Sequence, residues 1–264
     1  MKERLPLLDH PLSSPSAFTP EALVNAVRMD RHLNPEPIPD VCILEFDGDL
    51  TDWLVSRGVA KTNRAWACFH TTMYSVNVDG MICGIVPRTI GGPYAVLVAE
   101  QMAVSGARLV LGLTSAGRVA SSMPVPGLAV ATRAIRDEGT SYHYLPQAAG
   151  VDAPREVAKL LESELRTLTL PVLFGTVWTT DAPYRETEEQ LARHAEAEVL
   201  AVEMQAASLF AFSKARGFPV GLVAYVTNSL GQAGKDFDKG SHQLEFEILK
   251  KICRAGDRWV SSKR

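Results

Sequence analysis

The sequence has few of the features that mark secreted, metal-stabilised or membrane-spanning proteins. Its 264 residues hold only four cysteines, and no two of them are spaced as Cys-x-x-Cys. We therefore expect neither a disulfide framework nor a metal site, and we interpret the cysteines as reduced, mostly buried thiols of a cytoplasmic protein. No apolar run approaches the about 20 residues of a membrane-spanning helix, and no apolar core follows the N-terminal charges as in a signal peptide. The sequence thus predicts no membrane partner.

An excess of charge of one sign is also lacking. Lysine and arginine number 27, aspartate and glutamate number 30, and the formal net charge is -3. Proteins that bind nucleic-acid polymers normally carry a strongly basic face, so this class of partner is not expected. Hydrophobic residues make up 46% of the chain, which is enough to bury a sizeable core.

The chain begins with a segment that differs from the rest. Its first residues are rich in proline and serine, and Thr19-Pro20-Glu21 is then typical of a helix start, with an N-cap, a proline in the first turn and an acid. Residues 1–40 are therefore interpreted as an N-terminal helical extension. The strands and helices that follow alternate without a clear boundary, which predicts one α/β domain over residues 1–264 with a central sheet.

The stretch 199–230 is where a site is predicted first. It has the pattern strand, helix, strand, and two strands joined by one helix form a parallel βαβ unit with a right-handed crossover. Ligands of such sheets bind beyond the carboxyl ends of the strands. Those ends carry Glu203-Met204-Gln205 and Asn228, a carboxylate and two amides that can hold a ligand with several hydroxyl groups.

Each of these residues also has a purely structural interpretation. Glu203 fits the first turn of a helix, where the helix dipole favours an acid. Met204 fits an apolar core, and Asn228 fits a turn. Their occurrence together at strand ends favours a binding site.

A second unit of the same kind covers residues 85–117. Gly91 and Gly92 precede its helix, and glycines at a helix N-terminus let the backbone approach an anion. Thr114 and Ser115 follow its second strand, where hydroxyl groups can contact phosphate or ribose. A tight turn explains these small residues equally well.

Two more candidates come from other segments. Gly48 lies between two aspartates after a strand, in a turn that could approach an anion, although the acids favour a plain turn. His70 lies in the strand-like run 66–78, where a structural histidine is the default interpretation and a site residue is the alternative.

Four stretches together resemble the nucleoside phosphorylase family, which includes uridine phosphorylase, bacterial purine nucleoside phosphorylase and the methylthioadenosine nucleosidases. They run in the family's order and read IGGP (90–93), TSAG (114–117), GTVWTTDAPYRET (175–187) and VEMQAA (202–207). The resemblance implies a mixed β-sheet wrapped by helices, assembled as a homo-oligomer, either a dimer or a trimer of dimers. It also implies cleavage of a nucleoside N-glycosidic bond, with phosphate as the nucleophile in the phosphorylases and water in the nucleosidases.

The same resemblance implies roles for individual residues. The catalytic residues would be Glu203 and Asn228. The ribose would be held by Glu203, Met204 and Gln205. The base would be surrounded by Trp178, Tyr184, Arg185 and Asn228. The phosphate loops would contain Gly48, Gly91, Gly92, Thr114 and Ser115. His70 is a candidate for a contribution to a neighbouring subunit's site. Phosphate would be a co-substrate, and no cofactor or metal is expected.

Two of these positions bear on the substrate. By the resemblance, Asn228 matches a position near the base, where the purine enzymes of the family have aspartate and the uridine enzymes asparagine. An amide cannot protonate purine N7, so a pyrimidine or a modified base is expected to fit better. Gln205 stands where the family usually has a glutamate, so one charge beside the sugar is lost.

The phosphate-binding arginines of the family are replaced in this chain. Gly112 and Asp52 stand at two of their positions. Burying a phosphate dianion requires paired cations or many backbone donors, so a cation would have to come from elsewhere. The candidates are Arg57, Arg64, Arg88 and Arg118. Three functions stay open: a phosphorylase that releases base and ribose 1-phosphate, a phosphate-independent nucleosidase, and a nucleoside-binding protein that has lost catalysis.

Overall fold

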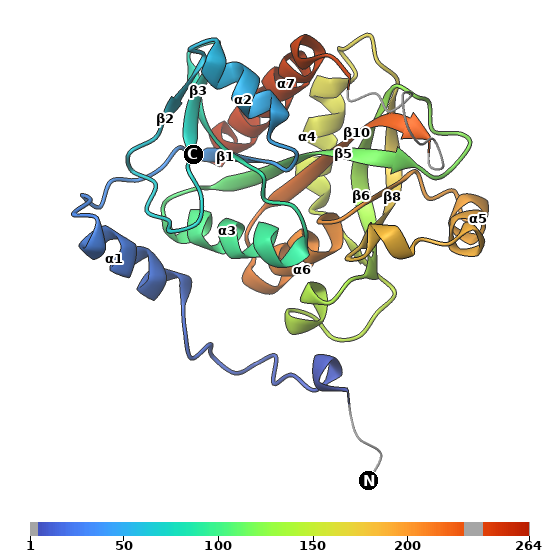
Figure 1. Cartoon of the computed structure of the whole chain (residues 1–264), viewed down its shortest axis with the longest axis horizontal. Coiled ribbons are helices and arrows are strands. Elements are labelled where there is room, and N and C mark those ends of the chain that lie inside the picture. Colours follow the sequence, from blue (N-terminus) through green and yellow to red (C-terminus); the bar gives the residue numbers. More distant parts are fainter. Residues whose placement is uncertain (1–4, 230–239, 264) are drawn as a thin grey trace.

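A mixed β-sheet with helices on both faces forms the centre of the computed structural model, which describes residues 5–229 and 240–263 (Figure 1). Its strands are β1 (Val41–Glu45), β2 (Ala60–Thr62), β3 (Tyr74–Val78), β4 (Met81–Pro87), β5 (Leu109–Arg118), β6 (Gly127–Asp137), β7 (Gly150–Asp152), β8 (Val172–Thr180), β9 (Ala201–Glu203) and β10 (Val220–Ser229). The predicted α/β class and mixed sheet are confirmed.

Seven α-helices among the described residues cover this sheet. They are α1 (Pro20–Asp30), α2 (Asp49–Ser56), α3 (Gly92–Val104), α4 (Arg155–Leu165), α5 (Glu188–Glu196), α6 (Ala206–Arg216) and α7 (His242–Ser261). Short 3-10 turns are η1 (Pro6–Leu8), η2 (Thr140–His143) and η3 (Pro183–Arg185). None of the described helices is long and apolar enough to cross a bilayer.

The helix in the N-terminal extension begins where the sequence predicts. The Thr19 side chain accepts a hydrogen bond from the Ala22 backbone N–H at 3.3 Å, so it caps α1. Val24 and Val27 of this helix are buried with Ala67 in a small cluster of their own. The extension is therefore packed onto the sheet-bearing part of the chain next to α3.

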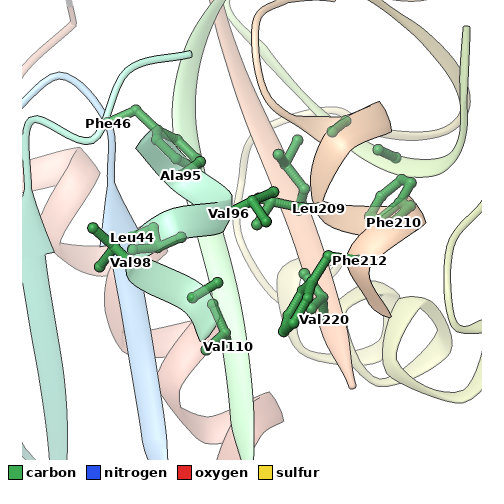
Figure 2. Close-up of a cluster of buried hydrophobic side chains, with 14 of the residues drawn as sticks. Leu44, Phe46, Ala95, Val96, Val98, Val110, Leu209, Phe210, Phe212 and Val220 are labelled. Carbon is green, nitrogen blue, oxygen red and sulfur yellow. The ribbon is translucent and has the colours of Figure 1, made fainter. Parts of the chain in front are cut away.

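Two layers of apolar side chains hold the helices on the sheet. On one face, α3 and α6 pack against strands β1, β5 and β10, and Figure 2 shows Val96 of α3 and Leu209 of α6 pointing toward one another. On the other face, a second cluster joins α2, α4 and α7 to the strands, with Leu54, Leu161 and Ile252 buried in it. Burying one such side chain contributes about 1.5–3 kcal/mol.

Five of the strands close into a ring. β10 pairs in parallel with β5 on one side and antiparallel with β6 on the other, and β6, β8, β9 and β5 complete the circuit. β9 runs antiparallel to the last residues of β5, with Val202 opposite Gly117. The predicted elements of the stretch 199–230 are thus confirmed, but their parallel βαβ pairing is wrong, because β9 and β10 flank different edges of β5.

The predicted strand over residues 66–78 is too long. Only its last part forms β3, whereas Trp66 to Met73 is irregular although mostly apolar. Trp66, Ala67, Cys68 and Met73 of this segment are buried without forming a strand. The Trp66 indole N–H donates to Thr71 Oγ1 at 2.7 Å. The dipeptide Asp79-Gly80 is typical of a hairpin turn, and it joins the antiparallel strands β3 and β4. Both residues have positive φ, 53° and 90°, as a tight two-residue turn requires.

Candidate functional site

A cavity of about 430 Å³ opens where β5, β9 and β10 end. We call it the central cavity. The end of β5 lies between the other two strands, because Gly117 is opposite Val202 of β9 on one side and Asn228 of β10 on the other. The unpredicted antiparallel pairing therefore still brings the two predicted strand ends to one place. Among the predicted site residues, those that line this cavity are Thr114, Ser115, Tyr184, Glu203, Met204, Gln205 and Asn228.

Glu203 is the buried charge of the central cavity, with 4% of its surface exposed. Its carboxylate accepts hydrogen bonds from Thr179 Oγ1 at 2.5 Å and from the backbone N–H groups of Gln205 at 2.6 Å and Ala206 at 2.8 Å. Burial raises the pKa of Glu203 to about 7, and the nearby Glu138 acts in the same direction, while the three hydrogen bonds oppose the shift. A carboxyl that titrates near neutral pH is typical of functional sites.

Two amide side chains flank this carboxylate. Gln205 Oε1 accepts from the Met204 backbone N–H at 3.2 Å, and Asn228 Nδ2 donates to Thr227 Oγ1 at 3.0 Å. Both residues are buried. Amides both donate and accept hydrogen bonds, so this wall is suited to hydroxyl and carbonyl groups of a ligand.

The predicted phosphate side of the cavity holds carboxylates. Asp47 accepts from the Ser115 backbone N–H at 2.8 Å and from Ser115 Oγ at 2.7 Å. Beneath it, Glu45 accepts from the Gly48 N–H at 2.6 Å and from Thr51 Oγ1 at 2.8 Å. Two of the predicted anion-binding residues, Gly48 and Ser115, thus already donate to carboxylates of this chain.

No lysine, arginine or histidine is among the described residues that line the central cavity. Arg88, a candidate replacement for the missing phosphate cations, instead donates to Asp52, with Nη1 at 3.1 Å from Oδ1. Its side chain crosses Gly48, where a Cβ atom would lie 2.5 Å from Arg88 Cγ. Arg88 is therefore paired with Asp52, the residue that the resemblance places where the family has a phosphate-binding arginine.

Trp178 and Arg185 line a neighbouring cavity of about 500 Å³, which we call the side cavity. Trp178 is 1% exposed, and its indole N–H donates to Asp137 Oδ2 at 3.0 Å. Successive side chains of a strand point to opposite faces, and of Trp178 and Thr179 it is Thr179 that reaches Glu203. The structure therefore does not bring these two predicted base-binding residues to the central cavity.

Gly48, Gly91, Gly92 and His70 also lie outside the lining of the central cavity. Gly92 allows close packing of helices, because a Cβ atom there would lie 2.1 Å from Ser208 Oγ of α6. Gly91 has φ of 89°, which favours glycine. His70 is exposed in the irregular segment before β3, and its carbonyl accepts from the Tyr94 hydroxyl at 3.2 Å.

Sequence reasoning missed two acids that line the central cavity, Asp47 and Glu186. Asp47 lies two residues after the end of β1, so the rule that pointed to Glu203 at a strand end also applied to it. Glu186 lies inside the GTVWTTDAPYRET stretch, next to residues that the resemblance did select. Because Asp47 was interpreted only as part of a turn, its contact with Ser115 was not predicted.

The buried acids predict a pH dependence of stability. Burial raises the pKa of Glu45 and of Glu203 to about 7, above the ordinary value of 4.5. Between these values the folded state binds more protons than the unfolded state. The contribution of each carboxyl to the free energy of unfolding is therefore fully present below pH 4.5 and is lost as pH rises toward 7.

We expect the wild type to lose up to about 3 kcal/mol of unfolding free energy relative to Glu45→Gln as pH rises from about 5 to about 8. Urea unfolding of both proteins at the two pH values measures this difference. A difference that stays constant with pH would contradict the raised pKa.

A family model described as the phosphorylase superfamily matches residues 46–254 of this sequence. The chain belongs to the phosphorylase superfamily. The resemblance on which the site was predicted is thereby confirmed, as is the expectation of an enzyme of this kind. The match begins at the end of β1, so the N-terminal extension lies outside it.

Individual relatives of this superfamily member are distant. A guanosine phosphorylase of Halorubrum lacusprofundi is 29% identical over 171 residues, which cover 62% of this chain and 69% of the relative. A uridine phosphorylase of Thermococcus kodakarensis is 27% identical over 187 residues, covering 63% and 65%. A uridine phosphorylase of Escherichia coli is 23% identical over 201 residues, covering 71% and 79%. The relatives thus differ in the base for which they are named.

Proposed function

We propose that this superfamily member cleaves the N-glycosidic bond of a nucleoside and transfers the pentosyl group to phosphate, releasing the base and ribose 1-phosphate. The supporting observation is the central cavity itself, where the buried Glu203 and the amides of Gln205 and Asn228 come together from β9 and β10. The names of the relatives support the same reaction.

The carboxylate of Glu203 can stabilise the positive charge that develops on the ribose in this reaction. As the bond to the base breaks, positive charge grows on the ribose and negative charge on the base. A carboxylate already held by three hydrogen bonds stabilises the positive centre without reorganising. Gln205 would bind the sugar hydroxyls, and Asn228 would hydrogen-bond the base. Because burial raises the pKa of Glu203 to about 7, its charged form predominates only above neutral pH.

Hydrolysis is a second candidate reaction, supported by Asp47. This carboxylate sits on Ser115 at the place predicted for phosphate, and the described lining offers no cation to balance a dianion. A carboxylate in that position can accept a proton from an attacking water. A third outcome is a protein that binds nucleosides without cleaving them.

Chromatographic measurement of base release from a panel of nucleosides, with and without phosphate, tests the proposal. We expect release that requires phosphate and is accompanied by sugar 1-phosphate. Release of free sugar without phosphate would assign hydrolysis instead. Thermal stabilisation by a nucleoside with no base release would assign a binding protein.

Replacing Asp47 with asparagine separates the two reactions further. The amide can still accept from Ser115 but no longer repels an anion, so we expect KM for phosphate to fall by about 10-fold in a phosphorylase. If Asp47 is instead the base that activates water, base release falls by about 100-fold. Asp152→Asn, an exposed change on β7, is the matched control and should alter neither quantity.

We also propose that the enzyme is a cytoplasmic homo-oligomer. The exposed segment that carries His70 also exposes 44% of Phe69, and Leu97 on the nearby helix α3 is 42% exposed. Large exposed apolar side chains are common where copies of a chain meet. Light scattering after size-exclusion chromatography gives the mass, and a monomeric mass would contradict the proposal.

A further inference from the structure

We propose that residues 5–10, which we call the strap, form a detachable wall of the side cavity that is released when His10 and His143 are both protonated. The strap belongs to the N-terminal extension, which precedes residues 46–254 that the phosphorylase superfamily model matches. The inference goes beyond the proposed function, because it concerns the wall of the cavity next to the proposed site.

The strap closes one side of the side cavity with three leucines. Leu5, Leu7 and Leu8 line this cavity together with Trp178. Leu7 lies against the turn after β6, since a Cβ atom on Gly139 would be 3.9 Å from Leu7 Cδ1. Figure 1 shows the chain between η1 and α1 running along the outside of the molecule. Release of the strap would therefore open the side cavity to solvent.

The strap is weakly held. The hydrogen bonds of η1, from the Leu8 N–H to the Leu5 carbonyl at 2.9 Å and from the Asp9 N–H to the Pro6 carbonyl at 3.1 Å, lie within the strap itself. The exposed fractions are 65% for Leu5 and 46% for Leu8. Apolar side chains stabilise in proportion to the area that they bury, so these leucines contribute only part of their possible effect. An unfavourable change at another contact can thus release the strap.

That other contact is a pair of histidines. The ring of His10 in the strap packs on His143 of η2, with ring centroids 4.0 Å apart and an angle of 40° between the planes. Neutral imidazoles can pack in this way, whereas two imidazolium ions at this distance repel each other. Among the described residues, His10 Nε2 is buried and has no hydrogen-bond partner, so no acceptor is in place for a proton on that nitrogen.

Three acids lie near the histidine pair. Glu138 in the turn after β6 favours a proton on His143, Asp181 lines a cavity of about 440 Å³ with His143, and Asp9 precedes His10 in the strap. Burial and His10 nevertheless lower the pKa of His143 below its ordinary value of 6.5. The docked strap therefore binds protons less readily than the released strap.

Docking of the strap should depend on pH with the opposite sign to the effect of the buried acids. The contribution of His143 to docking is fully present above pH 6.5 and is lost as pH falls below it. While the released state binds one proton more, the docking equilibrium changes by about 10-fold for each pH unit. Thr180 and Glu186 line both the side cavity and the central cavity, so release alters a wall that adjoins the proposed site.

Fluorescence anisotropy of a label on the strap tests this inference in the full chain. Leu5→Cys provides the attachment point, since the four native cysteines are buried. With a dye whose emission does not depend on pH, we expect high anisotropy at pH 8 and a loss toward that of a free segment at pH 5. His143→Phe keeps a ring for His10 to pack on but cannot be protonated, so its anisotropy should stay high at both pH values. His10→Phe should behave in the same way.

Met29→Cys is the matched labelling control. Met29 is 78% exposed on α1, a helix that Val24 and Val27 anchor, so the anisotropy of a label there should be the same at both pH values. A fall at Met29 as well as at the strap would indicate general unfolding in acid and would overturn selective release.

Three other outcomes would also overturn the inference. Low anisotropy of the strap label already at pH 8 would show that the strap is not docked. Constant anisotropy between pH 8 and pH 5 would show that protonation does not release it. An equal fall in wild type and in His143→Phe would show that the histidine pair is not the cause. These readouts do not depend on turnover, so each of these results leaves the proposed nucleoside cleavage standing.

Discussion

Glu203→Gln is expected to lower kcat/KM for the best nucleoside by about 100- to 1,000-fold, the loss found when one fixed electrostatic group is removed from a developing charge. Glutamine keeps the shape and one acceptor oxygen but removes the negative charge that would face the ribose in the proposed reaction. Wild-type kcat/KM should also rise with pH through about 7, because burial raises the pKa of Glu203 to about 7, and this limb should vanish in the variant. Steady-state assays between pH 5.5 and pH 8.5 measure both effects.

Glu100→Gln serves as the control for this experiment. Glu100 is a partly buried carboxylate on α3 that accepts from the Tyr144 hydroxyl at 2.8 Å and lies outside the lining of the central cavity. Glu100→Gln should change the free energy of unfolding only slightly and should leave kcat/KM close to the wild-type value. Equal activity of Glu203→Gln and wild type would show that the reaction takes place elsewhere.

Gly92→Ala is expected to destabilise the protein by about 1–3 kcal/mol, the usual range for overpacking a filled core. The new Cβ atom would lie 2.1 Å from Ser208 Oγ and 2.9 Å from Ser208 Cβ, so α3 and α6 cannot keep their present distance. Ser208 also donates to Glu138 Oε2 at 2.6 Å, and the clash strains that bond. Thermal unfolding should show a melting temperature several degrees lower, at about 2–4 °C per kcal/mol for a chain of this size.

Two further variants identify the cause of this loss. Ser208→Gly removes the atoms with which the new Cβ atom clashes. It should therefore lower the free energy of unfolding less when added to Gly92→Ala than when made alone in the wild type. Gly139→Ala is the matched control, because its Cβ atom would make only ordinary contacts, the nearest at 3.6 Å from Asp181 Oδ2. A Gly92→Ala protein as stable as Gly139→Ala would refute the packing argument.

Elements with a strong local pattern could be predicted from the sequence. The sequence pattern predicts a strand over 172–180 and a final helix over 243–260, and these match β8 and α7 within a residue or two. Their apolar spacing and flanking residues act locally, which makes such elements predictable. The segment 66–73 could not be assigned correctly, since burial alone gives it the composition of a strand. The helix α2 was also missed, because it starts directly from the turn at Gly48.

The candidate site shows the same division. Glu203, Gln205 and Asn228 were predicted because they lie at or just after the ends of predicted strands, and they line the central cavity. The contact between Asp47 and Ser115 joins residues 68 positions apart, and no local pattern indicates it. Trp178 illustrates the converse: its place in a family-like stretch suggested base binding, whereas the side chain is buried against His194, with ring centroids 4.5 Å apart.

The ring formed by β5, β10, β6, β8 and β9 also bears on how the protein behaves when crowded. Closure of the ring pairs most of the strand edges within it, and the outermost strands of the described sheet, β2 and β7, have three residues each. Short edges offer few unpaired backbone groups to a strand from another molecule. Edge-to-edge aggregation of the folded enzyme is therefore suppressed by topology, and the exposed charges of Lys61 on β2 and Asp152 on β7 act in the same direction.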